Sequence, residues 1–63
     1  TRLTTRELEI LQLTCSGKVA KEIAAALQLS TGSVESYRKE LLRKTNTKNV
    51  AELVTFAHRN GLL

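Results

Sequence analysis

Residues 21–44 read KEIAAALQLSTGSVESYRKELLRK, a stretch that predicts two helices joined by a tight turn. The first helix is short, about residues 21–28, and three consecutive alanines favour it. Its apolar face consists of Ile23, Ala24 and Leu27. After a turn at residues 28–30, Ser30 is the expected N-cap of a longer helix over about residues 31–44. This arrangement is typical of a helix-turn-helix motif.

The longer helix has two faces of different chemistry. Apolar side chains recur on one side at about 100° per residue. They are Val34, Tyr37 and Leu41, with Thr45 beyond them. The opposite side carries charged and polar groups, namely Glu35, Ser36, Lys39 and Arg43. The first face is expected to pack on a core, and the second is expected to meet a partner or solvent.

Two further helices flank this pair. The first is expected to begin after Thr4, which fits a capping box with Glu7, and to end at Gly17. Its predicted core stripe consists of Leu8, Leu11 and Cys15. The last is expected to begin at Asn49, in another capping-box pattern, and to end at Asn60-Gly61, with Leu62 and Leu63 folded back over its end. Its apolar stripe consists of Val50, Leu53, Val54 and Ala57, widened by Phe56. The sequence therefore predicts an all-α, four-helix helix-turn-helix domain over residues 1–63.

Composition limits the function. The chain has 63 residues, ten Lys and Arg against six acidic residues, and a net charge of +4. A basic balance favours an anionic partner such as nucleic acid, although small domains also carry such charge for solubility. Cys15 and His58 are the only cysteine and histidine, so no metal site or other cofactor is expected. No apolar run approaches the ~20 residues of a membrane span, so a cytoplasmic location is expected by default.

Several motifs run through the chain in one register: LTTRELEIL at residues 3–11, Gly17, Lys21 to Ala24, Leu27, Leu29-Ser30, Ser33 to Glu35, Lys44, Ala51 to Leu53, and the closing Gly61-Leu62-Leu63. Together they resemble the LuxR-type (GerE-type) DNA-binding domain of bacterial transcription regulators. The resemblance implies a homodimer, formed through the fourth helix, on a near-palindromic site of double-stranded DNA. It also implies that the chain is the C-terminal part of a longer regulator, most often a response regulator of a two-component system with a phosphorylated receiver, sometimes one with a small-molecule sensor. RNA polymerase is a further candidate partner.

The chain departs from the family pattern at four places. Val19-Ala20 stand where Ser-Asn is usual, which removes a capping hydroxyl and is expected to weaken the start of the second helix by ~1 kcal/mol. Tyr37 replaces a common His. Thr45 and Thr47 replace apolar residues, which is expected to weaken packing below the third helix.

The outward face of the third helix supplies the predicted DNA contacts. Lys39, Ser36 and Glu35 are predicted to contact base edges, because Lys donates to guanine, Ser suits several bases, and Glu accepts from cytosine. The predicted phosphate contacts are Lys21, Arg38, Arg43 and Lys48. The alternative is a solvated face in which Glu35 and Lys39 form an i,i+4 ion pair. Lys44, on the flank, is a candidate for a structural role.

The apolar stripe of the fourth helix is wide for a small core, so a dimer contact is predicted at Val50, Val54 and Ala57. Other functions remain as alternatives. A sigma-factor promoter-reading domain also contains a helix-turn-helix, but the opening motif and the Gly-Leu-Leu ending argue against it. A protein-interaction module could use the basic face for an acidic partner. An enzyme is not expected, because no nucleophile, base and orienting group can be assembled from these residues.

Overall fold

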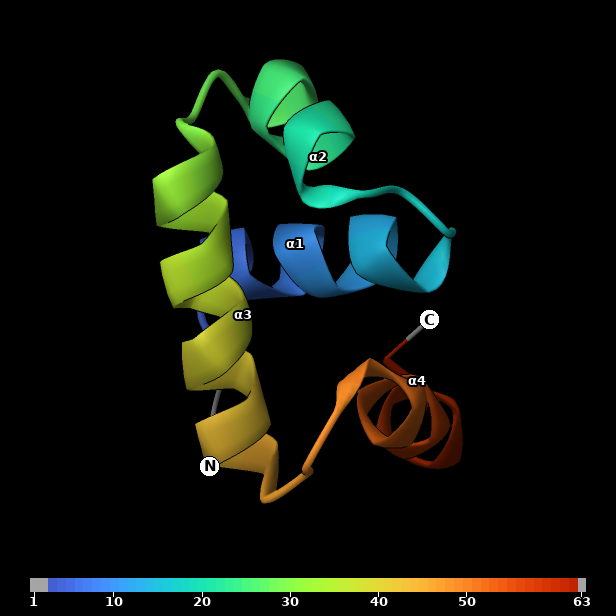
Figure 1. Cartoon of the computed structure of the whole chain (residues 1–63). Coiled ribbons are helices and arrows are strands. Elements are labelled where there is room, and N and C mark those ends of the chain that lie inside the picture. Colours follow the sequence, from blue (N-terminus) through green and yellow to red (C-terminus); the bar gives the residue numbers. More distant parts are fainter. Residues whose placement is uncertain (1–2, 63) are drawn as a thin grey trace.

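The computed structural model describes residues 3–62 and contains four helices: α1 (Thr5–Cys15), α2 (Ala20–Leu27), α3 (Thr31–Thr45) and α4 (Val50–Arg59). The described residues form no strand, and the predicted all-α fold is confirmed. Figure 1 shows α3 along one side of the molecule, α1 crossing behind it, and α2 and α4 towards its two ends. Helix α3 packs on each of the other three helices, as α1 also does, so the other three helices together hold α3 in place.

All four helices contribute to one small core. Its buried apolar residues are Ile10, Leu11, Ile23, Ala24, Val34, Leu41, Leu53 and Ala57. The faces predicted for α2 and α3 are confirmed, since Ile23, Val34 and Leu41 are fully buried. None of the helices within residues 3–62 combines the length and the apolar character that a bilayer crossing requires.

The stripe predicted for α1 is wrong in part. Leu11 is fully buried, but Leu8 and Cys15 are only half-buried, and burial raises the pKa of the Cys15 thiol. The face that points inward carries Glu7, Ile10, Leu11 and Thr14. α1 is apolar on more than one side, so periodicity alone does not fix which side turns to the core.

Three helices begin with the caps that the sequence predicts. Oγ1 of Thr4 accepts from the Glu7 N–H at 3.2 Å, and the Glu7 carboxylate accepts from the Thr4 N–H at 2.8 Å. Ser30 caps α3 and Asn49 caps α4 in the same first-turn geometry. The predicted reciprocal half at Asn49 is wrong, because the Glu52 carboxylate instead accepts from the Lys48 N–H at 2.8 Å.

Helix α2 begins with only half of a capping box. The Glu22 carboxylate accepts from the Val19 N–H at 3.0 Å, but Val19 has no polar atom that could accept in return. One first-turn donor therefore lacks the side-chain acceptor that Ser or Thr would supply. The loss of the capping hydroxyl expected from Val19 is thus observed, and the expected weakening of the helix start stays a prediction.

Each helix is followed by a residue in the left-handed conformation: Gly17, Gln28, Asn46 and Gly61. The next N–H then donates to a carbonyl five residues earlier, as in Lys18 to Leu13, Leu29 to Ala24, Thr47 to Leu42, and Leu62 to Ala57, over 2.8–3.2 Å. These bonds satisfy carbonyls that the helix end would leave open. Leu62 folds back and packs on the core as predicted, whereas Leu63 lies outside the described residues.

The hydroxyls of Thr45 and Thr47 are hydrogen-bonded within the turn that follows α3. The Thr45 hydroxyl donates to the Leu41 carbonyl at 2.7 Å and lies 2.9 Å from Oγ1 of Thr47. Thr45 is buried, so without these partners its hydroxyl would cost free energy of folding. The turn from α3 to α4 thus replaces apolar packing with a hydrogen-bonded pair.

Candidate nucleic-acid interface

Helix α3 turns its polar face to solvent, as the sequence predicts. Glu35, Ser36, Lys39 and Arg43 are exposed, while Val34 and Leu41 on the opposite side are fully buried. Tyr37 is half-buried and packs on the core. The buried side chains fix the position of the helix backbone. The donors and acceptors of the outward face are therefore attached at fixed places on the surface.

Carboxylates hold three of the four cationic side chains of α3. Arg38 lies 3.3 Å from the Glu35 carboxylate, and Nε of Arg43 donates to Glu40 at 2.8 Å. Nζ of Lys44 donates to Glu7 at 2.9 Å. Among the described residues, Lys39 has no carboxylate within 4.0 Å.

The alternative in which Lys39 only pairs with Glu35 is therefore not observed. Glu35 bonds Arg38, one turn along the helix, and leaves the Lys39 ammonium exposed to solvent. Lys39 is thus the cation of α3 that can reach a ligand without first giving up a carboxylate.

Lys44 has the structural role that its flank position suggested. It reaches from the last turn of α3 to Glu7 in the first turn of α1, and the Glu7 side chain is only 5% exposed. The backbone N–H of Thr4 and the ammonium of Lys44 hold the pKa of the Glu7 carboxyl below its ordinary value, against the opposing effect of burial. This contact was missed from the sequence, where Glu7 was read as a capping residue alone.

The remaining predicted phosphate contacts lie on other elements. Lys21 is exposed in the first turn of α2, and Lys48 is exposed in the segment between α3 and α4. Of the predicted DNA contacts, Glu35, Ser36, Lys39 and Arg43 share the exposed face of α3, whereas Arg38 is half-buried at its flank. The described residues contain no cluster of His, Cys, Asp or Glu that could bind a metal.

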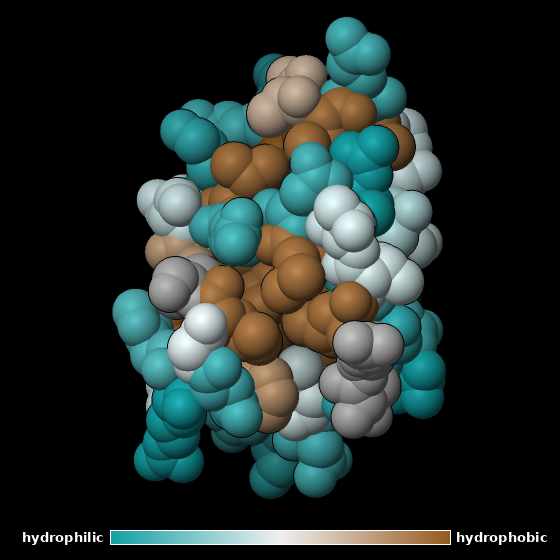
Figure 2. All heavy atoms as spheres, turned by 180° about the vertical axis from the view of Figure 1, so that it is seen from behind, coloured by the Kyte–Doolittle hydropathy of each residue, from teal (hydrophilic) through white to brown (hydrophobic). Residues whose placement is uncertain are grey.

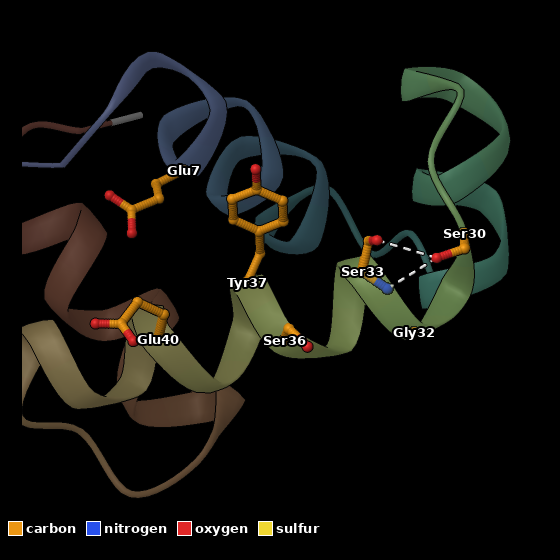
Figure 3. A pocket seen from close by; sticks show the side chains of 7 residues that line it. All are labelled: Glu7, Ser30, Gly32, Ser33, Ser36, Tyr37 and Glu40. Atoms are coloured by element: carbon orange, nitrogen blue, oxygen red, sulfur yellow. Dashed lines mark hydrogen bonds between the residues drawn. The ribbon is translucent and has the colours of Figure 1, made fainter.

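A hollow of about 690 Å³ lies beside the first half of α3, and sequence reasoning did not anticipate it. Its lining consists of Glu7, Ser30, Gly32, Ser33, Ser36, Tyr37 and Glu40. Figure 3 shows the Tyr37 ring extending from α3 towards α1, and the Ser30 and Ser33 hydroxyls joined by a hydrogen bond of 3.0 Å. Two carboxylates in the lining, those of Glu7 and Glu40, make this hollow unfavourable for a phosphate.

The predicted dimer residues of α4 differ in exposure. Val50 and Val54 are half-buried, whereas Ala57 is fully buried and belongs to the core. Ala57 has no surface to offer a partner, so we leave it out of the dimer contact. His58 is exposed on the same helix.

Figure 2 shows further apolar side chains gathered across the face turned away in Figure 1. Apolar residues Leu3, Leu8, Phe56 and Leu62 line a hollow between α1, α3 and α4.

Comparison with known proteins agrees with the resemblance in the sequence. Residues 1–57 match the family described as bacterial regulatory proteins, luxR family. The chain is 44% identical over 59 residues to the uncharacterized transcriptional regulatory protein YvfU of Bacillus subtilis (strain 168), covering 94% of this chain and 30% of YvfU. It is 46% identical over 61 residues to the uncharacterized response regulatory protein YgeK of Escherichia coli (strain K12), covering 97% of this chain and 42% of YgeK.

A solved structure shares the whole fold. The crystal structure of response regulator ChrA, from a heme-sensing two-component system, superposes with a TM-score of 0.93 at 28% sequence identity. The match covers 100% of this chain and 31% of ChrA. The chain thus spans less than half the length of each of these three proteins.

Proposed function

The chain belongs to the LuxR family of bacterial regulatory proteins, and on that premise we propose that it reads a specific duplex DNA sequence with α3 in the major groove. The observation that carries the proposal is the outward face of α3. Lys39 and Ser36 are exposed one turn apart, and the opposite side of the helix is anchored in the core. A helix held in this way can present base-reading groups without losing its own position.

Lys39, Ser36 and Glu35 are the proposed base contacts. An exposed Lys39 can donate to the O6 and N7 acceptors of guanine, and Glu35 can accept from the amino group of cytosine. Ser36 suits either a base edge or the backbone. Each contact needs a defined base at a defined place, so together they would give sequence preference.

Arg38, Arg43, Lys21 and Lys48 are the proposed phosphate contacts. They come from α2, α3 and the segment before α4, so they can hold the helix against the backbone at several points. Arg38 and Arg43 must exchange a carboxylate for a phosphate to do so.

The whole regulator is proposed to be longer than this chain and to act as a dimer. YgeK and ChrA are named response regulators, so a receiver module that controls assembly is the proposed partner domain. The dimer contact is proposed at Val50 and Val54 of α4, and the target is a near-palindromic site. Such a regulator would work in the cytoplasm, where RNA polymerase is a further partner.

Selection of bound sequences from random duplexes tests the proposal directly, and the selected duplex then serves for variants. Lys39→Ala is expected to cost ~1–3 kcal/mol on the selected duplex and to relax preference at one base pair. Arg43→Ala is expected to weaken binding to all duplexes alike. It should also reduce by about 1 the salt slope, which is the slope of log affinity against log salt concentration.

Val34→Asp provides the contrast, since it places a charge in the core and should unfold the domain, as circular dichroism would report. If Lys39→Ala and Arg43→Ala both leave binding unchanged, α3 is not the reading element. Binding to an acidic protein, with no duplex selected, would favour the protein-interaction alternative.

A further inference from the structure

The two arginines of α3, the half-buried Arg38 and the exposed Arg43, each form an ion pair with a carboxylate of the same helix. Glu35 bonds Arg38 and Glu40 bonds Arg43, each from three residues earlier. The Arg43 and Glu40 side chains are 70% and 40% exposed, so this pair stands open to an approaching anion. In the other pair the Glu35 side chain is 60% exposed and the Arg38 side chain 24%, so a phosphate can reach Arg38 over a smaller surface. The hydrogen bond from Arg43 also lowers the pKa of the Glu40 carboxyl, so Glu40 remains charged at neutral pH.

Exposed pairs of this kind are weak in water and can be exchanged. The Glu7–Lys44 pair differs, because both of its side chains are largely buried and no phosphate can reach between them. Among the ion pairs of α3, exchange is therefore confined to Arg38 and Arg43, the two arginines that the proposed function assigns to phosphates.

We propose that Glu35 and Glu40 compete with DNA phosphates for Arg38 and Arg43, and that Glu35 is in addition a specificity-determining residue. The inference rests on the proposed function of α3. When a phosphate takes either arginine, the released carboxylate stays on the helix beside a polyanion that repels it. Each arginine then contributes less net attraction to any duplex than its charge alone would supply, which weakens non-specific binding.

The two carboxylates act differently on the preferred sequence. Glu35 is exposed on the reading face beside Ser36, so a cytosine amino group can donate a hydrogen bond to the carboxylate that Arg38 releases. Its penalty is recovered only where that base is present, so Glu35 attracts one sequence and repels others. Glu40 is half-buried and lines the hollow beside α3, and no base contact is proposed for it, so its penalty applies to every duplex.

The test compares the 63-residue chain with Glu35→Gln, Glu40→Gln and the double variant, on the selected duplex and a scrambled one between 50 and 200 mM salt. Each lost carboxylate should steepen the salt slope on scrambled DNA by up to ~0.9. Between 50 and 200 mM salt, the affinity of such a variant should then fall about threefold more than that of the unaltered chain. The double variant should show about a tenfold larger change. Glu40→Gln should raise the affinity for both duplexes by the same factor. Glu35→Gln should reduce the ratio of the affinity for the selected duplex to that for the scrambled one.

Glu9→Gln is the matched control. Glu9 also faces an arginine three residues away, Arg6, and its removal changes the net charge by the same amount. It lines a hollow between α1 and α2 and lies apart from the reading face. The inference predicts that Glu9→Gln leaves the slope on scrambled DNA near that of the unaltered chain, with circular dichroism confirming that all variants fold.

The outcomes separate the two proposals. If the unaltered chain prefers its selected duplex but the Glu35 and Glu40 variants keep its slope and affinity on scrambled DNA, the inference is wrong and the proposed function stands. If Glu9→Gln raised the affinity and the salt slope on scrambled DNA as much as the Glu35 and Glu40 variants do, the inference would also be wrong, because net charge alone would then explain the effect. A chain that selects no duplex overturns the proposed function and the inference together.

Discussion

At the scale of single residues, two buried threonines have opposite surroundings. Among the described residues, Oγ1 of Thr14 is buried without a hydrogen-bond partner, whereas Oγ1 of Thr45 has partners in Leu41 and Thr47. A buried hydroxyl that lacks a partner pays for its lost hydration without compensation. The two positions should therefore respond differently to the same substitution.

Thr14→Val is expected to stabilise the fold by ~1 kcal/mol, because it removes the unsatisfied hydroxyl and nearly keeps the shape. Urea unfolding followed by circular dichroism would measure the change. Thr45→Val is the matched control and should be destabilising, since it leaves the Thr47 hydroxyl without its partner. A loss of stability at both positions would mean that the Thr14 hydroxyl has a favourable contact after all.

Glu7 makes stability depend on pH. Its pKa is lowered in the folded chain, first by the Thr4 N–H and then by Lys44. A lowered carboxyl pKa contributes stability that is fully present above the unfolded value of about 4.3 and is lost as pH falls through the folded value. We expect the free energy of unfolding to fall in this acid range, and Glu7→Gln to flatten that fall.

At neutral pH, Glu7→Gln should cost about 1–3 kcal/mol, because Lys44 is left largely buried without its carboxylate. Unfolding curves between pH 2 and pH 7 would measure both effects. Glu9→Gln, on the same helix in an exposed pair, should change neither by much. A Glu7→Gln variant with the pH dependence of the unaltered chain would contradict this account.

At the scale of helices, the weakest start is that of α2. Val19 is 59% exposed, so replacing it loses little buried apolar surface. Val19→Ser should complete the capping box with Glu22 and raise stability by ~1 kcal/mol. Thermal unfolding would measure it, with Val19→Ala as the control that lacks the hydroxyl. If Ser and Ala have the same effect, the side-chain cap contributes nothing here.

The helices show what local sequence can and cannot predict. Caps at Thr4, Ser30 and Asn49 were predictable because each acts within one turn of its own position. The left-handed Gln28 was not, since Gln has no preference for that conformation and the short turn imposes it. The orientation of α1 was missed because its apolar residues do not form one stripe.

The site was predictable to the same limit. Exposure along α3 followed from the period of its apolar side chains, and the structure agrees. The ion pairs could not be predicted in the same way, because an i,i+3 and an i,i+4 partner are equally reasonable on a helix. Glu35 pairs with Arg38 at i,i+3 and not with Lys39 at i,i+4. The pair of Lys44 with Glu7 joins distant residues, which no local pattern can connect.

At the scale of the whole molecule, α4 should provide the contact between two chains. The half-buried Val54 is not among the side chains that pack on the core cluster, so it can serve a partner. Val54→Glu should remove the gain in affinity on a paired, near-palindromic site while keeping binding to a single half-site. Titration of the two duplexes would measure this.

Two controls sit beside Val54 on the same helix. Thr55→Glu adds the same charge at an exposed position and should keep the gain on the paired site. Leu53→Glu should unfold the chain, because Leu53 is fully buried. If Val54→Glu unfolds the chain as well, Val54 belongs to the core and the dimer contact lies elsewhere.

The ion pair between Lys44 and Glu7 also bears on the order in which the chain folds. It joins residues 37 positions apart, whereas the helix caps close within three or four residues. A contact across so long a loop can form only after the entropy of closing that loop has been lost. We therefore expect the pair to form late in folding, so that its loss in Glu7→Gln speeds unfolding more than it slows folding.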